Sequence, residues 1–272
     1  MVAVDAALGP LAPGETIHIA HDGLSVEIAP AAGGRIAQIT RDDLEWLVGY
    51  SAANPASIDW GSFPMLPWAG RIRRGSFDFD GNRYQLSPNL GAHAIHGIAF
   101  GLPWHVDTHS PSHVELSLQL PEGEHWPFGG IARQRIAIAR DTLRLALSVT
   151  AQARAMPVVI GWHPWLRKPD RMGFAPSQCY PRDAEGIATL PLVKPPPRPW
   201  DDCFINRRPV IVQRGGQTLR LRSDCTHWVM YDEPEDATCI EPQSGPPDAF
   251  NLEPSVLAPG ATRAAWYLWE WL

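Results

Sequence analysis

The sequence has few basic residues and no long helical pattern, and each scarcity excludes a class of protein. Its 272 residues include 23 Lys+Arg against 29 Asp+Glu, which gives a formal net charge of -6. Nucleic-acid binding depends mainly on basic contacts to phosphate, so we expect no nucleic-acid partner. No stretch keeps a 3.6-residue period for more than about three turns. No glycine-rich loop precedes a helix either, which excludes a nucleotide-binding fold.

Cysteine is also scarce, and its spacing excludes common redox and metal motifs. Cys179, Cys203, Cys225 and Cys239 lie far apart, with no Cys-x-x-Cys pair. The first five residues show no basic segment followed by an apolar one, so we expect no export signal and a cytoplasmic protein. Free thiols and no bound metal are therefore expected.

The longest stretch without Asp, Glu, Lys or Arg covers residues 84–106. It is long enough for a membrane span, but it contains three histidines and two prolines. A spanning helix needs about 20 predominantly apolar residues. We therefore expect no membrane contact and interpret the stretch as buried and close to a functional site.

What the sequence has in quantity is proline, tryptophan and a period of two. Its 28 prolines are about twice the average usage and argue against a helical protein. Residues 114–120 alternate apolar and polar side chains throughout. Such alternation predicts a strand with one solvated face. Many short segments of this kind, separated by Gly and Pro, predict an all-β fold, a large antiparallel β-sandwich, with residues 1–272 as a single domain.

Two hairpins are expected, one around the turn at residues 140–142 and one around the turn at 80–82. Further strands are expected at residues 25–28, 34–40, 157–161, 218–222, 228–231 and 264–271.

The segment at residues 191–200, PLVKPPPRPW, has two interpretations. It has the composition of an interdomain linker or of a polyproline ligand. Because strands are expected on both sides, we favour a stiff surface loop. At the C-terminus, Trp266, Trp269 and Trp271 are expected in the core, with a dimer patch as the alternative. The sequence leaves both a monomer and a homodimer open.

Four segments combine ionisable side chains with rigid aromatic surroundings. They are residues 63–75, 93–100, 161–166 and 239–251, and residues 200–204 lie between the last two. A histidine next to aromatic residues is usually structural. Trp68, Trp104, Trp162 and Trp165 are each expected in the core more often than in a site. The functional alternative is a pocket whose flat aromatic faces and polar groups bind a sugar ring.

In their order along the chain, these segments resemble the aldose 1-epimerase (galactose mutarotase) family. The resemblance rests on Arg-Ile at 71–72 followed by Gly75 and Phe77, on Ile-His-Gly at 95–97 and on Gly-x-His-Pro-aromatic at 161–165. It continues through Asp-x-Cys-Phe at 201–204, Glu-Pro-x-x-Gly-Pro-Pro-x-Ala-Phe-Asn at 241–251 and Leu-x-Pro-Gly at 257–260. It implies a β-supersandwich with an open pocket on one face and a small-molecule sugar substrate.

The resemblance also implies a role for five residues. Glu241 matches the general base that takes the proton from the anomeric hydroxyl, and His163 matches the general acid that protonates the ring oxygen. Arg71, His96 and Asp201 match positions that hold the substrate hydroxyls. A Glu ionised at pH 7 and a His that carries a proton near neutrality suit the two transfers, each worth about 10²–10⁴-fold. No cofactor is needed.

Three departures from the family pattern concern the sugar. Gly70 stands where many members have Asn, Ile98 where the galactose enzymes often have Gly, and the chain is shorter than those enzymes. These departures put galactose in doubt but do not affect the acid and the base.

Three alternatives stay open. Arg71, Arg73 and Arg74 suggest an epimerase for a sugar phosphate or another acidic sugar, although on a strand at most two of them would converge. A non-catalytic carbohydrate-binding protein is the second alternative, and a glycoside hydrolase with Asp201 and Glu241 as paired carboxylates is the third.

Overall fold

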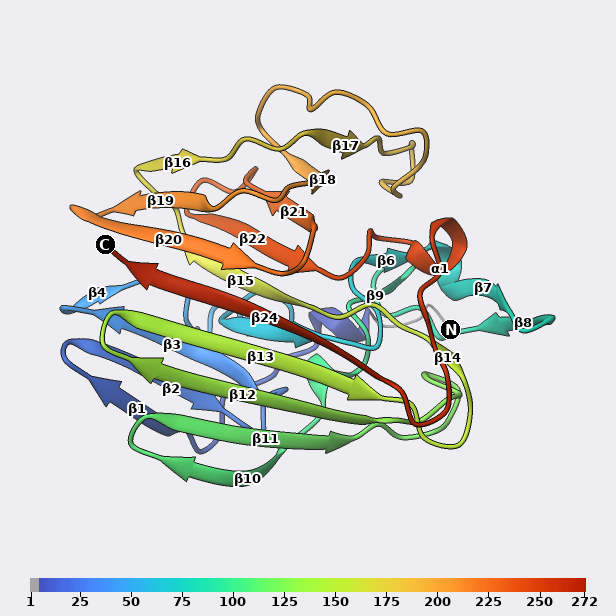
Figure 1. Ribbon diagram of the computed structural model, residues 1–272, viewed down its shortest axis with the longest axis horizontal. Coiled ribbons are helices and arrows are strands. Elements are labelled where there is room, and N and C mark those ends of the chain that lie inside the picture. The colour runs from blue at the N-terminus through green and yellow to red at the C-terminus, as the bar shows by residue number, and fades with distance from the viewer. Residues whose placement is uncertain (1–4) are drawn as a thin grey trace.

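The computed structural model describes residues 5–272 and shows two large antiparallel sheets packed face to face (Figure 1). The expectation of no export signal was based on the first five residues, and residues 1–4 lie outside the described residues. The all-β sandwich predicted from the sequence is confirmed. No helix in the described part of the chain has the length and apolar character needed to cross a membrane.

The first sheet carries the candidate site. In spatial order its strands are β1 (Ile17–His21), β2 (Leu24–Ala29), β3 (Arg35–Arg41), β5 (Ser62–Met65), β15 (Gly161–Arg167), β22 (Ala237–Gln243), β21 (His227–Tyr231), β18 (Asp201–Ile205) and β17 (Gln178–Tyr180), with β4 (Leu44–Glu45) paired to β3. The central strands β15 and β22 come from distant parts of the chain.

The second sheet packs against one face of the first. In spatial order its strands are β10 (His105–Ser110), β11 (His113–Gln119), β12 (Ile131–Ala139), β13 (Thr142–Thr150), β24 (Thr262–Trp271), β20 (Gln217–Ser223), β19 (Val210–Arg214) and β16 (Arg171–Gly173). Alternating apolar residues of β11, β12 and β13 turn toward the first sheet and are buried, as the period of two predicts.

Short elements complete the chain and surround the site. They are the strand pairs β6 (Arg71–Ile72) with β9 (Ala94–Ile95), β7 (Ser76–Phe79) with β8 (Asn82–Gln85) and β14 (Met156–Pro157) with β23 (Val256–Leu257), the 3-10 turns η1 (Ala6–Leu8), η2 (Arg73–Gly75) and η3 (Ala99–Gly101), and the helix α1 (Ala249–Leu252).

The core between the sheets is rich in aromatic side chains. The Tyr267 ring of β24 lies 5.9 Å from the rings of both Trp162 and Trp228, on two strands of the first sheet. Its hydroxyl donates a hydrogen bond to the carbonyl of Ile240 at 3.1 Å. These contacts hold the central strands of the first sheet on the face that packs against the second sheet. The opposite face of the same strands is therefore held in place as well.

One strand expectation was wrong. Residues 157–161 do not form a strand, because β14 ends at Pro157 and β15 begins at Gly161. The backbone amides of the apolar residues between these strands form hydrogen bonds outside the sheets. Val158 donates to the carbonyl of Ser255 and Val159 to that of Pro67, both at 2.8 Å. The apolar run is therefore a buried connection and not part of a ladder.

The other uncertain segments are settled by burial and pairing. Residues 191–200 form a mostly exposed loop between β17 and β18, which pair in one sheet. Trp269 and Trp271 lie in the core, as expected. Trp266 is partly exposed and lies under the guanidinium of Arg144.

Candidate functional site

The site lies on the face of the first sheet that points away from the second. Gly161 pairs with Gln243 and Trp165 with Cys239 across β15 and β22, so His163 lies opposite Glu241. Directly opposed residues of an antiparallel pair share one face. The neighbouring strands continue the same rows, since Glu241 pairs with Val229 and His163 with Phe63.

Glu241 and His163 form a buried pair at the bottom of a cavity. Their side chains are 3% and 8% exposed, and Nε2 of His163 lies 3.4 Å from Oε1 of Glu241. The ring of Phe63 stacks on the imidazole at 4.7 Å between centroids. Gln243 donates a hydrogen bond to Oε2 of Glu241 at 3.3 Å. The two groups are thus held in contact by packing and by a neighbouring amide.

Burial governs the protonation of this pair. Removal from water raises the pKa of Glu241 well above its usual value, and the charge of Asp201 raises it further. Burial lowers the pKa of His163 to about 3. Both shifts disfavour the charged form of the group concerned. Shifts in these directions favour a pair that shares one proton and is neutral overall, whereas the sequence suggested two independently charged groups.

His96 approaches the pair from the opposite wall. Its Nδ1 accepts a hydrogen bond from the amide of Gly70 at 3.3 Å, and its ring lies 4.9 Å from that of His163. Burial lowers the pKa of His96 well below its usual value, and the nearby His163 and Arg71 lower it further. A neutral ring that accepts at Nδ1 carries its proton on Nε2, so His96 offers one N–H donor.

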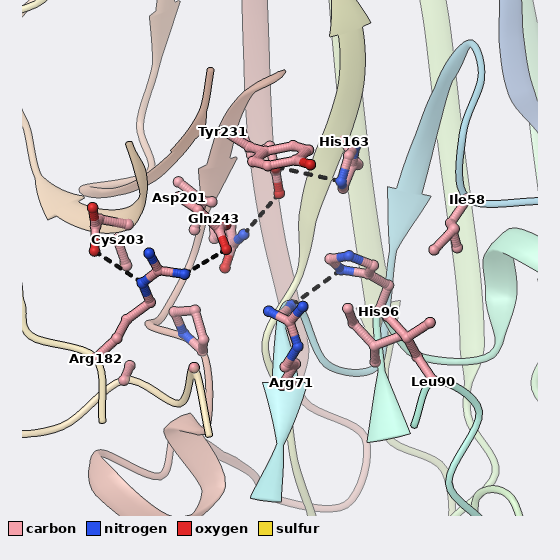
Figure 2. Close-up of a pocket in the computed structure, with 18 of the residues that line it drawn as sticks. Ile58, Arg71, Leu90, His96, His163, Arg182, Asp201, Cys203, Tyr231 and Gln243 are labelled. Carbon is pink, nitrogen blue, oxygen red and sulfur yellow. Dashed lines mark hydrogen bonds and ion pairs between the residues drawn. The ribbon is translucent and has the colours of Figure 1, made fainter. Parts of the chain in front are cut away.

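Arg71 and Asp201 complete the polar lining. Arg71 lines the cavity below His96 (Figure 2), and among residues 5–272 its guanidinium forms no hydrogen bond or ion pair. Asp201 pairs instead with Arg182 at 2.5 Å, and Arg182 also reaches Asp202 at 3.1 Å. Burial raises the pKa of Asp201, although Arg182 opposes the shift.

All five residues singled out from the sequence line one cavity of about 340 Å³. This volume falls at the lower end of the range typical of small-molecule sites, about 300–1,000 Å³. Of the four tryptophans considered, only Trp165 lines the cavity, and the other three are buried in the core as expected.

Among the lining residues that were not singled out from the sequence, three polar ones are close to the five expected residues or pair with them: Tyr231, Gln243 and Arg182. Tyr231 and Gln243 lie on predicted or quoted segments, and their strand positions in line with Cys239 and Gly161 would have identified them once the register was known. Arg182 had no local signal, because it lies in a proline-rich connection that matches no motif.

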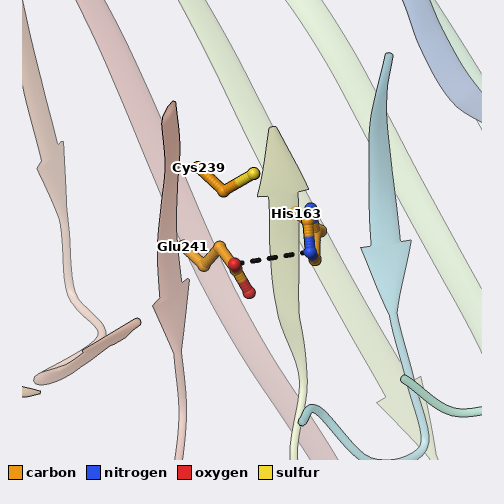
Figure 3. Close-up of side chains that lie close together, drawn as sticks. All are labelled: His163, Cys239 and Glu241. Carbon is orange, nitrogen blue, oxygen red and sulfur yellow. Dashed lines mark ion pairs between the residues drawn. The ribbon is translucent and has the colours of Figure 1, made fainter. Parts of the chain in front are cut away.

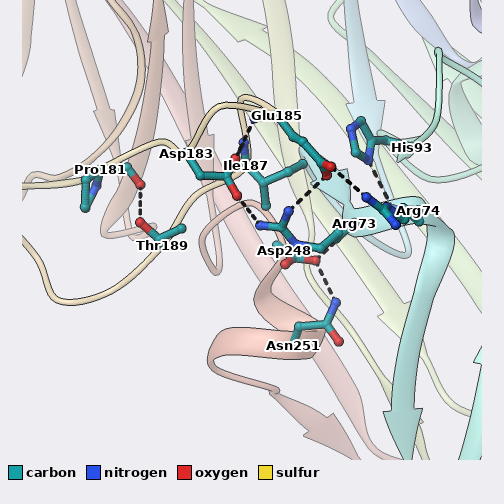
Figure 4. A network of polar contacts seen from close by, with 10 residues as sticks. All are labelled: Arg73, Arg74, His93, Pro181, Asp183, Glu185, Ile187, Thr189, Asp248 and Asn251. Carbon is teal, nitrogen blue, oxygen red and sulfur yellow. Dashed lines mark hydrogen bonds and ion pairs between the residues drawn. The ribbon is translucent and has the colours of Figure 1, made fainter.

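The basic cluster near Arg71 does not converge on the cavity. Only Arg71 and Ile72 form a strand, and η2 follows immediately, with Arg74 at φ 51°. Arg73 pairs with Asp183 at 2.6 Å and with Glu185 at 3.1 Å, and Arg74 pairs with Glu185 at 2.7 Å (Figure 4). Arg73 and Arg74 therefore do not lie on a strand, as the estimate that at most two of the three would converge had assumed, and both contact the same carboxylate.

Pro247 leaves no room for a side chain at position 70, where the sequence has Gly70. Its φ is +69°, and an added Cβ would lie 2.6 Å from the Cβ of Pro247. Two carbons cannot approach that closely, so Pro247 occupies the space that a side chain at position 70 would need.

Comparison with known proteins finds one family profile that covers most of the chain. The sequence profile described as "Aldose 1-epimerase" matches residues 15–269. The uncharacterised proteins YphB and YihR of Escherichia coli K12 are 31% and 25% identical over 152 and 158 residues, which is 54% and 56% of this chain. The chain spans about half the length of these curated relatives.

Solved structures show the same fold. A putative aldose 1-epimerase from Escherichia coli K12 matches with a TM-score of 0.84 and 22% identity, over 95% of this chain and 99% of that one. A galactose 1-epimerase from Lactobacillus acidophilus matches with a TM-score of 0.81 and 16% identity, over 94% of each chain.

Proposed function

The chain belongs to the aldose 1-epimerase family, and from this premise we propose that it interconverts the α and β anomers of a free aldose. The observation that carries the proposal is the buried contact of 3.4 Å between His163 and Glu241 at the bottom of a cavity of sugar size. Such a pair can remove one proton and deliver another within one small volume.

In the proposed reaction, Glu241 removes the proton from O1 while His163 protonates O5. The C1–O5 bond breaks, C1=O1 becomes an aldehyde, and rotation about C1–C2 presents its other face. O5 then attacks C1, His163 recovers its proton, and Glu241 returns a proton to O1. The protein ends each turnover in its starting state.

The pair begins the cycle with a single proton. The reactive form has that proton on His163 and leaves Glu241 as a carboxylate. Gln243, which donates a hydrogen bond to Glu241, and the positive charge of Arg71 both favour the carboxylate. Hydroxyl groups of a bound sugar would add further hydrogen bonds to it.

The remaining lining residues suit a polyol. In this proposal Arg71 and the Nε2–H of His96 donate to sugar hydroxyls, and Asp201 accepts from one of them. Trp165 offers an apolar face to the ring, beside the imidazole of His163 at 5.5 Å.

The pocket favours a neutral sugar over a phosphorylated or acidic one. Asp59, Asp201, Asp202 and Glu233 line the cavity, against Arg71 and Arg182. Arg182 is already paired with two of these carboxylates. Arg73 and Arg74, which suggested a phosphate site, are held by acidic partners.

The other two alternatives explain less of the site. A purely carbohydrate-binding protein gives no role to a buried acid and base in contact. A glycoside hydrolase would use Asp201 and Glu241 as its carboxylates. Asp201 is tied to Arg182, and His163 would have no part in that reaction.

The test is anomer exchange measured by magnetisation-transfer NMR on a panel of glucose, galactose, xylose, fucose, arabinose and glucose 6-phosphate. We expect at least one sugar to exchange faster than its uncatalysed rate. Glu241→Gln should abolish this acceleration while sugar affinity stays within about tenfold, and His163→Asn should slow it by at least about 10²-fold.

Glu115→Gln is the matched control, because it makes the same chemical change on β11 of the other sheet. It should retain the parental rate. An active Glu241→Gln variant would remove Glu241 from the mechanism. A parent that binds sugars, as followed by Trp fluorescence, but accelerates none of them would favour the carbohydrate-binding alternative.

A further inference from the structure

A thiol lies next to the buried pair. Cys239 is two residues before Glu241 on β22 and therefore points to the same face of the sheet. One ligand atom from each of His163, Cys239 and Glu241 lies within 4.8 Å of the other two (Figure 3). All three residues are buried. In the mechanism proposed above, Cys239 has no role.

The three side chains are held by a rigid frame. Both strands lie in the centre of the first sheet, and Cys239 pairs with Trp165 while Glu241 lies opposite His163. Tyr267 supports β22 from behind through its hydrogen bond to Ile240. Because these side chains are already ordered, little conformational entropy would be lost if all three bound the same ligand.

We propose that His163, Cys239 and Glu241 form a binding site for one Zn²⁺ ion, with a fourth coordination position open to the cavity. Imidazole nitrogen, thiolate sulfur and carboxylate oxygen are the three donors that zinc takes in proteins, and three protein ligands with one open position are typical of accessible zinc sites.

The spacing fits a tetrahedral ion. Zinc–ligand bonds of about 2.0–2.3 Å place adjacent donor atoms of a tetrahedron about 3.3–3.8 Å apart. The distance of 3.4 Å between Nε2 of His163 and Oε1 of Glu241 lies in this range. The Sγ atom of Cys239 lies within 4.8 Å of the other two donor atoms, and it completes the set when the three side chains close around the ion.

Proton balance is straightforward. The ion replaces the proton of the Cys239 thiol and the proton shared by Glu241 and His163, and both protons leave to solvent. The product holds Zn²⁺ with one thiolate, one carboxylate and a neutral imidazole, so the buried site carries no net charge.

Zinc at this site would occupy both the acid and the base. If the proposed mutarotase activity holds, and this step rests on it, Zn²⁺ inhibits the enzyme by competing with sugar for the bottom of the cavity. Binding itself does not depend on that activity, so the two proposals can fail separately.

The experiment is a titration of the full chain with Co²⁺ as a spectroscopic substitute for zinc, followed by displacement with Zn²⁺. We expect one ion per chain, a sulfur-to-cobalt charge-transfer band and loss of that band as Zn²⁺ is added. Cys239→Ser should abolish the band and weaken Zn²⁺ binding by at least about tenfold, since even a lost partner behind a metal ligand costs about 10–100-fold.

Cys203→Ser is the matched control, because Cys203 is also a buried free cysteine and lines the cavity, but among the described residues it belongs to no cluster of metal-binding side chains. It should keep the band. Absence of the band in the parent, or its loss in Cys203→Ser with retention in Cys239→Ser, would overturn the zinc site, and the parental measurement decides even if a variant fails to fold.

Inhibition of anomer exchange by Zn²⁺ is measured in a separate experiment. Zn²⁺ should slow anomer exchange by the parent, and the activity that Cys239→Ser retains should resist the same concentration by at least about tenfold. A parent that shows the cobalt band but accelerates no sugar would leave the zinc site standing and count only against the mutarotase proposal.

Discussion

Glu241 and His163 are ordinary acid and base groups whose properties are changed by burial. The pKa of Glu241 is raised and that of His163 is lowered to about 3, in both cases because burial disfavours charge. In acid, activity ends when a second proton enters the pair, and in base it ends when the single proton leaves. The active one-proton form therefore covers a wide range of pH.

This arrangement predicts a pH profile unlike that of a free histidine. Activity should stay level from pH 7 down to about pH 5, because a His163 pKa of about 3 places the acid limb below that range. The measurement is the catalysed exchange rate between pH 4.5 and 8.5, corrected for the uncatalysed rate, with circular dichroism to confirm folding. A fall in activity centred near pH 6.5, the ordinary pKa of histidine, would contradict it.

Arg35 supports the site from within the protein. It is fully buried, and it donates to the carbonyls of Ala32, Ser57, Trp60 and Phe100 at 2.6–3.0 Å. No carboxylate in the described residues pairs with it, and burial lowers its pKa to about 9. Its guanidinium also lies 5.2 Å from the centre of the Phe63 ring that stacks on His163.

Replacing this arginine should therefore cost stability more than chemistry. A lysine at position 35 keeps the charge but cannot reach four carbonyls, and each buried acceptor left without a donor costs about 1–3 kcal/mol. Arg35→Lys should lower the free energy of unfolding by about 3–5 kcal/mol in urea titrations. Arg144→Lys, on the exposed face of β13, is the control and should change it by less than about 0.5 kcal/mol.

At the scale of elements, a loop closes one side of the cavity. Residues 181–189 connect Arg182, which pairs with Asp201 and Asp202, to Asp183 and Glu185, which pair with Arg73 and Arg74 (Figure 4). The hydrogen bond from Arg73 lowers the pKa of Asp183, and that from Arg74 lowers the pKa of Glu185. The loop is thus attached to both sides of the cavity by charge.

Removing one carboxylate should loosen this loop selectively. Glu185→Gln removes the contacts to both Arg73 and Arg74, and exposed ion pairs of this kind are individually weak. Amide hydrogen exchange of residues 182–188 should become faster by a few-fold, read by mass spectrometry. Asp78→Asn, which removes an exposed ion pair to Arg83 on the β7–β8 hairpin, should leave the loop unchanged. Equal exchange in parent and Glu185→Gln would show that the ion pairs do not hold the loop.

The same elements show how far the sequence could predict the structure. The alternation in residues 114–120 and 264–271 predicted strands, because each has one buried and one solvated face. Residues 157–161 misled, because a buried connection is as apolar as a buried strand. The link between Arg74 and Glu185 joins residues more than 100 positions apart, and no local pattern encodes such a contact.

For the whole molecule, charge bears on the choice of substrate. The chain carries a formal charge of -6, and the carboxylates that line the cavity outnumber its two arginines. A field of this sign lowers the local concentration of anionic sugars and slows their entry, and salt screens the effect. This field adds to the effect of the cavity lining, where Arg182 is already paired with two carboxylates and only Arg71 is left, among the described lining residues, as an unpaired arginine.

We therefore predict that the best aldohexose of the panel turns over with a kcat/KM at least about tenfold above that of its 6-phosphate at low salt, since about 1.4 kcal/mol of unfavourable interaction suffices for this ratio. The difference should narrow at 0.5 M NaCl, because screening at that ionic strength acts within a few ångströms. Both sugars are assayed by magnetisation transfer at 20 mM and 0.5 M NaCl. A phosphate ester that reacts faster at low salt and slows as salt is added would show attraction instead, and would restore Arg71 as an anion-binding residue.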